Sequence, residues 1–246
     1  MAVLALDTSA AVAVALVDDD GARLAARTST ERRRHAESLA PLIAEALAEA
    51  GLQRTDLTAV VGGTGPAPFT GLRVGLVTAR ALALSLGIDV LGVPSIDALA
   101  VQAVADLGLR PGDEVLAATD ARRKEVYWAR YRVVAHEGPH GVPVVETLRG
   151  PEVQKAAAVA AAQLDAPAES GAHLAVVGEG AALYPEDLPP DDDAPLVPDA
   201  TVLARVALAR RAAGEDLPTE PLYLRRPDVQ EPSGAKRVLP AGGGAS

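Results

Sequence analysis

The chain has 246 residues, of which 49% are hydrophobic and 2% aromatic, and its 23 basic and 33 acidic residues give a formal net charge of -10. Such a length buries one large core or two modest ones, and the negative charge repels nucleic-acid phosphates over most of the surface. Because the chain has no cysteine, disulfides, thiol catalysis and thiolate metal sites are excluded.

The start of the chain lacks the basic residues and long apolar run of a secretory signal. The longest apolar helix that the sequence predicts is interrupted by Arg73 and Arg80. We therefore expect a cytoplasmic protein with no membrane contact.

The first half of the chain alternates apolar runs with turn residues. Its second apolar run has apolar side chains on both faces, so we expect that strand to be covered on both sides. Helical spacing of apolar residues follows, and Gly51 ends that helix. The predicted order is strands over 3–6, 12–17 and 22–28, a helix over 38–50, a strand over 57–62, a helix over 72–86, a strand over 88–93 and a short helix from 95.

The second half repeats this order more weakly, without an alignable sequence repeat. We therefore predict an α/β protein with a first lobe over 1–106 and a smaller second lobe over 107–227, divided at a loop-forming cluster. A surface loop is expected over 188–198, and a disordered tail over 228–246. The predicted elements of this half are strands over 115–118, 125–134 and 142–148, a helix over 152–164, a strand over 174–177 and a helix over 201–213.

The segment 63–75 is the most informative part of the chain, because a Gly- and Pro-rich loop joins a buried strand to a helix. This arrangement places a helix N-terminus at the carboxyl edge of a parallel sheet, where ligands and partners bind. No lysine follows the glycines, so the loop is not a Walker loop. In the helix, Gly71, Gly75, Ala79 and Ala83 recur every four residues and leave a nearly flat stripe. We predict that a partner helix packs there; packing on the protein's own sheet is the alternative.

Asp7, Thr8 and Ser9 follow the first predicted strand. Two hydroxyls and turn amides suit a phosphate, and a carboxylate suits a water-bridged metal. A side-chain-capped turn is the simpler interpretation, and the turn has no glycine to let a phosphate approach the backbone.

Two other polar clusters have ordinary interpretations. His136 and His140 have the spacing of a helical metal pair, but the Gly138-Pro139 sequence argues for a solvated loop. The basic run 122–124 is expected to be a solvated turn, with a small-anion contact as the alternative.

Five segments of the chain resemble, in order, the TsaB family, formerly called YeaZ. The most specific is the Phe-Thr-Gly-Leu-Arg sequence at 69–73, although the family usually has Gly-Ser where this chain has Ala67-Pro68. The segments are Leu-Ala-Leu-Asp-Thr-Ser at 4–9, His-Ala-Glu-Ser-Leu at 35–39, Gly-Pro-Ala-Pro-Phe-Thr-Gly-Leu-Arg-Val-Gly at 65–75, Asp-Ala-Arg-Arg-Lys-Glu-Val-Tyr at 120–127 and Pro-Leu-Tyr-Leu-Arg at 221–225.

The resemblance implies a two-lobed actin-like ATPase fold (ASKHA, ribonuclease-H-like) with a reduced second lobe. It also implies a non-catalytic scaffold without a cofactor, which binds and activates the catalytic subunit TsaD in the bacterial complex that makes threonylcarbamoyladenosine next to the tRNA anticodon. The ATPase TsaE then joins, and tRNA is bound only through the complex. TsaD carries a His-x-x-x-His metal pair where this chain has Ser95 and Leu99. Since leucine has no donor atom and serine is a weak ligand, we expect no catalytic metal site and no enzyme.

We expect the partner surface on the helices that begin near Ser38 and Phe69, and the same surface to form a homodimer when TsaD is absent. One alternative is an actin-like ATP-dependent phosphotransferase that uses Asp7 for metal and Thr8 and Ser9 for phosphate. Another, a metallopeptidase, would need metal ligands that the chain lacks. The predicted interface residues are Leu39, Ile43, Phe69, Thr70, Gly71, Leu72, Arg73, Gly75 and Ala79.

Overall fold

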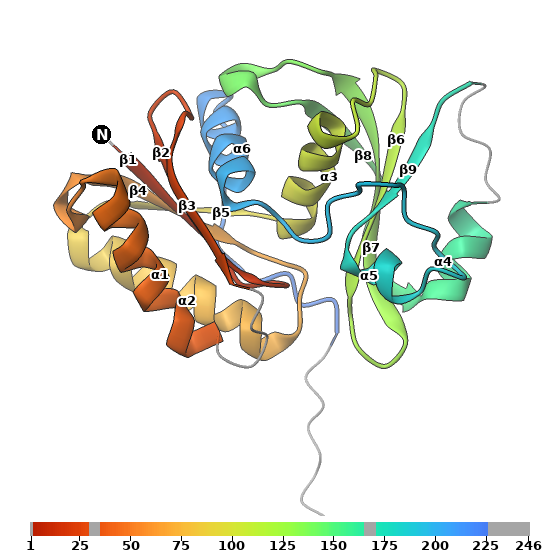
Figure 1. Ribbon diagram of the computed structural model, residues 1–246, viewed down its shortest axis with the longest axis horizontal. Coiled ribbons are helices and arrows are strands. Elements are labelled where there is room, and N and C mark those ends of the chain that lie inside the picture. The colour runs from red at the N-terminus through yellow and green to blue at the C-terminus, as the bar shows by residue number, and fades with distance from the viewer. Residues whose placement is uncertain (1, 30–34, 165–170, 226–246) are drawn as a thin grey trace, which may run out of the picture.

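The computed structural model describes residues 2–29, 35–164 and 171–225, which form two sheets with helices beside and between them (Figure 1). The first sheet has the strand order β3-β2-β1-β4-β5. β1 to β3 form an antiparallel meander, whereas β4 and β5 continue the sheet in parallel with β1. The strands are β1 (Ala2–Asp7), β2 (Val12–Asp18), β3 (Arg23–Ser29), β4 (Leu57–Gly63) and β5 (Asp89–Val93).

Helices cover both faces of this sheet. Helices α1 (His35–Ala50) and α2 (Phe69–Leu86) pack on one face, where Leu4 and Leu16 belong to their core. Helix α6 (Ala200–Ala212) packs on the other face, against alternate residues of β1 and β2. The prediction that the second strand is covered on both sides is therefore confirmed.

The second sheet has the strand order β8-β7-β6-β9, and β9 runs parallel to β6. Helix α3 (Ser95–Asp106) covers one face, and α4 (Ala156–Gln163) and α5 (Glu179–Leu183) cover the other. Short 3-10 helices lie at Arg54–Asp56 and Pro139–Gly141. The strands are β6 (Glu114–Asp120), β7 (Glu125–Ala135), β8 (Val144–Lys155) and β9 (Leu174–Val177).

The two halves of the chain exchange helices. α3 follows the last strand of the first sheet but packs on the second, whereas α6, near the end of the described chain, packs on the first. Both helices lie between the sheets (Figure 1). A cut at 106/107 would therefore separate each helix from the sheet that it covers, and the domain division stays a prediction.

Some predicted elements differ from the structure. The helix predicted over 152–164 begins only at Ala156, because Glu152 to Lys155 continue β8 and pair with β7. The helix predicted over 72–86 begins earlier, at Phe69. The segment 188–198 is irregular as expected, but Leu188 is fully buried in the core under α4 and α5. The predicted tail over 228–246 lies outside the described residues.

Candidate functional site

The Asp7-Thr8-Ser9 turn is bonded within the chain. Asp7 is 1% exposed; its Oδ1 accepts hydrogen bonds from Ser9 N (2.8 Å) and Ser9 Oγ (2.6 Å), and its Oδ2 accepts one from the Ser95 hydroxyl. The Thr8 hydroxyl donates to Gly71 O (2.8 Å) and accepts from Gly75 N (3.0 Å). These bonds are those of a side-chain-capped turn, and they join β1 to the first turns of α2 and to α3.

The small-residue side of α2 faces this turn and the sheet. Ala79 and Ala83 are fully buried, and a Cβ atom added at Gly75 would lie 2.5 Å from the Thr8 Oγ1 atom. The prediction of an exposed stripe is therefore wrong, and packing on the protein's own sheet is what the structure has. The reason is that the buried positions lie at i, i+3, i+4, i+7 and i+11 and so share one side of the helix: Leu72, Gly75, Leu76, Ala79 and Ala83.

The other predicted interface residues differ in exposure. Leu39 and Ile43 of α1 are buried in the same core as Ala79. Thr70 and Arg73 are exposed, and Phe69 and Gly71 are half-buried. The location of the interface therefore stays a prediction, now restricted to the exposed side of both helices.

That exposed side has an apolar surface. Leu84 is 85% exposed and Val77 is 63% exposed, and their spacing of seven residues places both on the side of α2 away from the sheet. A groove of about 700 Å³ lies between α1 and α2, where Thr78 and Leu82 are its lining residues from α2. The groove is lined mainly by small and apolar side chains, among them Ala40, Ile43, Ala44, Leu47, Leu52 and Leu82. We call Val77, Leu84 and this groove the outer helix face; the helices that carry it, α1 and α2, lie on the side of the first sheet away from α6 (Figure 1).

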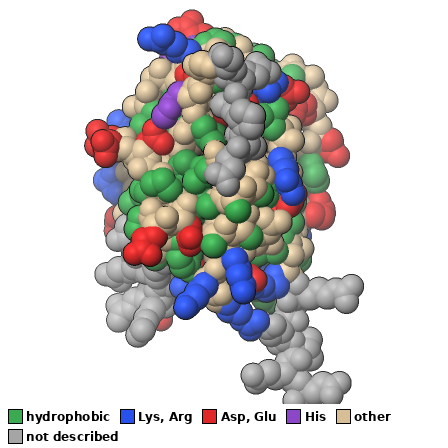
Figure 2. Space-filling view, turned by 90° about the vertical axis from the view of Figure 1, so that its right-hand side faces the viewer, with side chains coloured by type: hydrophobic (Ala, Val, Ile, Leu, Met, Phe, Trp, Pro, Cys, Tyr) green, Lys and Arg blue, Asp and Glu red, His purple; other side chains and the backbone are tan. Residues whose placement is uncertain are grey.

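A basic turn stands at the end of the second lobe. Arg122, Arg123 and Lys124 join β6 to β7 and are exposed, and Figure 2 shows Lys and Arg side chains gathered at the lower end of this lobe. A pocket of about 280 Å³ separates the turn from the start of α2. The turn is exposed, as expected, and two of its arginines, Arg122 and Arg123, also line this pocket.

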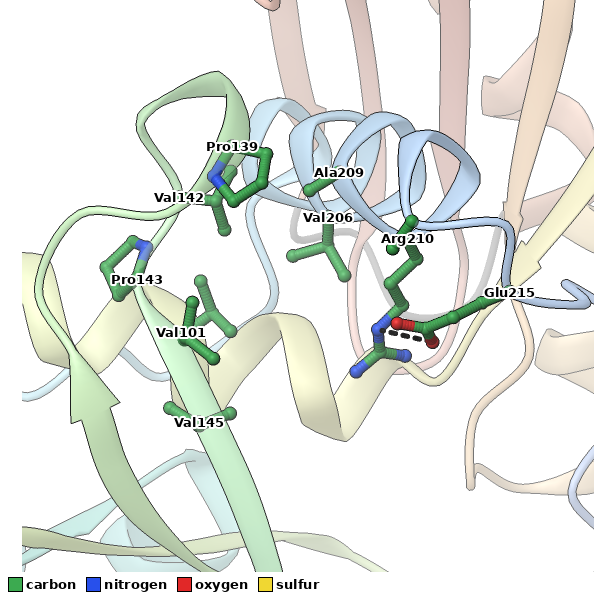
Figure 3. Close-up of a pocket in the computed structure, with 11 residues that line it drawn as sticks. Val101, Pro139, Val142, Pro143, Val145, Val206, Ala209, Arg210 and Glu215 are labelled. Carbon is green, nitrogen blue, oxygen red and sulfur yellow. Dashed lines mark ion pairs between the residues drawn. The ribbon is translucent and has the colours of Figure 1, made fainter.

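A second pocket lies between the lobes (Figure 3). Val101 of α3 and Val206 of α6 face it, and its volume is about 380 Å³. Arg210 stands at one end, where its Nη2 donates to Asp97 Oδ2 at 2.8 Å and its Nε lies 3.9 Å from Glu215 Oε2. Since these polar groups bond to one another, the pocket offers mainly apolar surface.

Ser95 and Leu99, at the positions where TsaD carries its metal-binding histidines, are both buried inside the chain. Leu99 is fully buried between α3 and the second sheet, and Ser95 bonds to Asp7 and receives a bond from Gly65 N (3.1 Å). His136 and His140 lie in the loop after β7, as expected. Within the described residues, no group of three or more His, Cys, Asp or Glu side chains is placed to hold a metal ion.

Comparisons of the sequence and of the fold with known proteins give relatives of the same kind. A family model described as TsaD, tRNA N6-adenosine threonylcarbamoyltransferase, matches residues 26–242. An uncharacterized protein of Mycobacterium tuberculosis is 42% identical over 232 residues, covering 93% of each chain. The tRNA threonylcarbamoyladenosine biosynthesis protein TsaB of Escherichia coli is 37% identical over 133 residues, covering 54% of this chain and 55% of that protein. The solved structure of YeaZ from Pseudomonas aeruginosa matches with a TM-score of 0.73 and 30% identity, over 91% of this chain and 99% of that one.

Proposed function

Because the chain belongs to the TsaB (YeaZ) family and has its two-lobed actin-like ATPase fold, we propose that it is a non-catalytic subunit of the system that makes threonylcarbamoyladenosine in tRNA. In this role it binds and activates a TsaD-like catalytic subunit in the cytoplasm. A TsaE-like ATPase joins through that complex, and tRNA is bound by the complex and not by the isolated subunit.

The observation that carries the proposal is the outer helix face. Burying an apolar side chain of this size stabilises a complex by roughly 1.5–3 kcal/mol, and contiguous exposed apolar surface marks interaction sites. Val77 and Leu84 extend into solvent from α2, and α2 also lines the apolar groove that it forms with α1. A partner that presents a helix of similar apolar character fills this groove and covers both side chains.

The chemistry of the rest of the molecule supports a binding role. An ATP-dependent phosphotransferase would need Asp7 and the Thr8 and Ser9 side chains to face a ligand, whereas Asp7 and Thr8 are buried and all three bond within the chain. A metallopeptidase would need donor atoms at the positions of Ser95 and Leu99. Leucine supplies none.

The first test places a charge on the outer helix face. Leu84→Glu introduces a carboxylate that must be desolvated when the partner docks, so we expect affinity for the TsaD-like subunit of the same organism to fall at least tenfold, about 1.4 kcal/mol. Leu183→Glu is the matched control, since Leu183 is 47% exposed on α5 of the second lobe. Co-elution and calorimetry with both variants measure the difference. Wild-type affinity of the folded Leu84→Glu variant would sink the proposal.

The same face predicts self-association of the pure protein. An apolar face that meets its own copy across a two-fold axis forms a closed dimer. Light scattering should give a mass near twice 25.1 kDa for the wild type and a monomer for Leu84→Glu, and addition of the catalytic subunit should replace the homodimer by a heterodimer. A wild-type monomer at high concentration would count against self-pairing.

A further inference from the structure

The pocket between the basic turn and α2 gathers cations on an acidic chain. Its lining comes from the start of α2, from the β6–β7 turn, from β7 and from the segment that follows α6. Its charged lining residues are Arg122, Arg123 and Arg225, although the whole chain has a net charge of -10. The remaining lining residues are Ala67, Pro68, Phe69, Ala121, Tyr127, Tyr223 and Leu224.

Two of these arginines are held in place by carboxylates outside the lining. Arg122 donates its backbone N–H to Asp120 Oδ1 (2.7 Å), and its Nη1 lies 3.1 Å from Asp120 Oδ2. Arg225 pairs with Glu125 and donates from Nη1 to Ala121 O (3.0 Å). A guanidinium has five donors, so each fixed arginine keeps N–H groups for a further acceptor, at a reduced entropy cost of binding.

The backbone of the turn is strained. Arg122, Arg123 and Lys124 have φ values of 63°, 57° and 61°, a left-handed conformation that costs a non-glycine residue roughly 1–2 kcal/mol. A glycine would adopt it freely. Strain of this kind is found at ligand sites, where the rest of the fold enforces it, and here it is carried by three consecutive cationic residues.

Aromatic surface completes the pocket. The chain has one Phe, four Tyr and one Trp, and half of them line this pocket: Phe69, Tyr127 and Tyr223. The Phe69 and Tyr223 ring centroids lie 5.0 Å apart, and the Arg73 guanidinium lies 3.7 Å above the Phe69 ring and donates to the Tyr223 hydroxyl (2.9 Å). Guanidinium groups recognise phosphate, and aromatic faces stack with nucleobases.

We propose that this pocket binds a nucleotide, with its phosphate at the arginines and its base against the Phe69 and Tyr223 rings. The inference rests on the proposed function, in which the complex acts on tRNA. A nucleotide within RNA and a free nucleotide share this chemistry, and the volume of about 280 Å³ suits one nucleotide unit. This proposal takes up the small-anion contact, which was the alternative interpretation of the basic run.

The test titrates the full chain with a fluorescent RNA hairpin that has the sequence of a tRNA anticodon arm and, separately, with ADP. Titrations are made at low salt and repeated on the complex with the catalytic subunit. We expect saturable, salt-sensitive binding of ADP by the isolated chain and of the RNA hairpin by the complex alone, and a loss of at least tenfold for Arg123→Glu. Arg110→Glu, in an exposed turn of the same lobe, should bind as the wild type does.

Arg123→Gly separates this role from folding. Because glycine adopts the observed φ freely, this variant should remain folded in chemical denaturation, while its binding weakens. The proposal is overturned if neither probe binds the chain or the complex, or if Arg110→Glu weakens binding as much as Arg123→Glu. Since the isolated chain is titrated as well, failure to form the complex would contradict the proposed function without deciding this test.

Discussion

Gly75 has a structural role that its spacing in the sequence does not reveal. Its N–H donates to the Thr8 hydroxyl, and the added Cβ of any other residue would lie 2.5 Å from that oxygen and 3.4 Å from the Thr8 Cβ and Cγ2 atoms. Thr8 in turn donates to Gly71 O. The glycine therefore allows the first turns of α2 to approach the end of β1, and substitution acts on the fold before it can act on a partner.

Gly75→Ala should lower the free energy of unfolding by about 1 kcal/mol. Overpacking costs roughly 1–3 kcal/mol, and the better helix propensity of alanine offsets about 1 kcal/mol of it. Chemical denaturation measures this change in the free energy of unfolding. The matched comparison is a double-mutant cycle with Thr8→Ala, which removes the clashing oxygen. We expect a coupling of at least 0.5 kcal/mol, roughly the lower bound for residues in contact; additive effects would show that the clash is not the cause.

Residue spacing left the small-residue stripe ambiguous for a physical reason. A flat stripe allows close approach by any backbone, and a sheet of the same chain satisfies it as well as a foreign helix does. Sequence reasoning also missed Val77 and Leu84 as exposed residues, because apolar residues all round a helix predict burial. The signal that could have found them is their seven-residue spacing, on the side opposite to Leu72 and Ala79.

At the scale of elements, the strands of the first sheet were the most predictable. β1 and β2 are short, uninterrupted apolar runs bounded by turn residues. Such runs are typical of strands that are covered on both faces, as these two are in the structure. The start of α4 was not predictable. Glu152 and Lys155 have low strand propensity, and the segment extends β8 because β7 offers an unpaired edge beside it. α5 has only five residues, too few for a periodic signal.

The loop from α3 to β6 depends on one carboxylate. Asp113 Oδ2 accepts from Arg110 N (2.7 Å), and its Oδ1 accepts from His173 N (3.0 Å), which ties the loop to the segment before β9. Burial alone raises the pKa of Asp113, but these two backbone hydrogen bonds, together with charge interactions with His173 and Arg110, outweigh it, so the pKa lies below its usual value of 3.8. The carboxylate therefore stabilises the fold above pH 3.8, and this contribution is lost as the pH falls through the lowered pKa.

Asp113→Asn should remove that acid-dependent contribution. The variant should be less stable than the wild type at neutral pH, because a neutral amide oxygen accepts hydrogen bonds more weakly than a carboxylate. The difference should shrink below about pH 4, where the aspartate begins to be protonated. Urea denaturation of the variant and the wild type at neutral and at acidic pH measures the difference in their free energies of unfolding at each pH. A difference that stays constant across this range would contradict the assignment of the linkage to Asp113.

At the scale of the whole molecule, the sequence predicted two lobes and the actin-like fold, but not how the lobes hold together. α3 packs its apolar face on the second sheet, and α6 packs its apolar face on the first. Both helices are rich in Ala and Val, and such a face would fit either sheet. Neither helix has a face whose pattern specifies its sheet. The polar contacts that fix the arrangement join residues far apart in the chain, as Asp97, Tyr131 and Arg210 do.

These three residues form a partly buried junction of α3, β7 and α6. Asp97 accepts from Tyr131 Oη (2.7 Å) and from Arg210 Nη2 (2.8 Å), so its charge is both paired and hydrogen-bonded. Burial, reinforced by the negative charge of Asp97, raises the pKa of Tyr131 well above 10.0. The folded state therefore keeps the phenol proton at a pH where the unfolded chain releases it, and stability is lost as the pH rises through the unfolded value.

Tyr131→Phe tests whether this junction couples the lobes. At neutral pH, loss of the hydrogen bond should lower the free energy of unfolding by about 1 kcal/mol. Above about pH 10 the wild type should lose stability more steeply than the variant, because only the wild type carries this phenol, and the gap between them should close. Denaturation at neutral and alkaline pH measures the gap. If it does not change with pH, Tyr131 is not the titrating group.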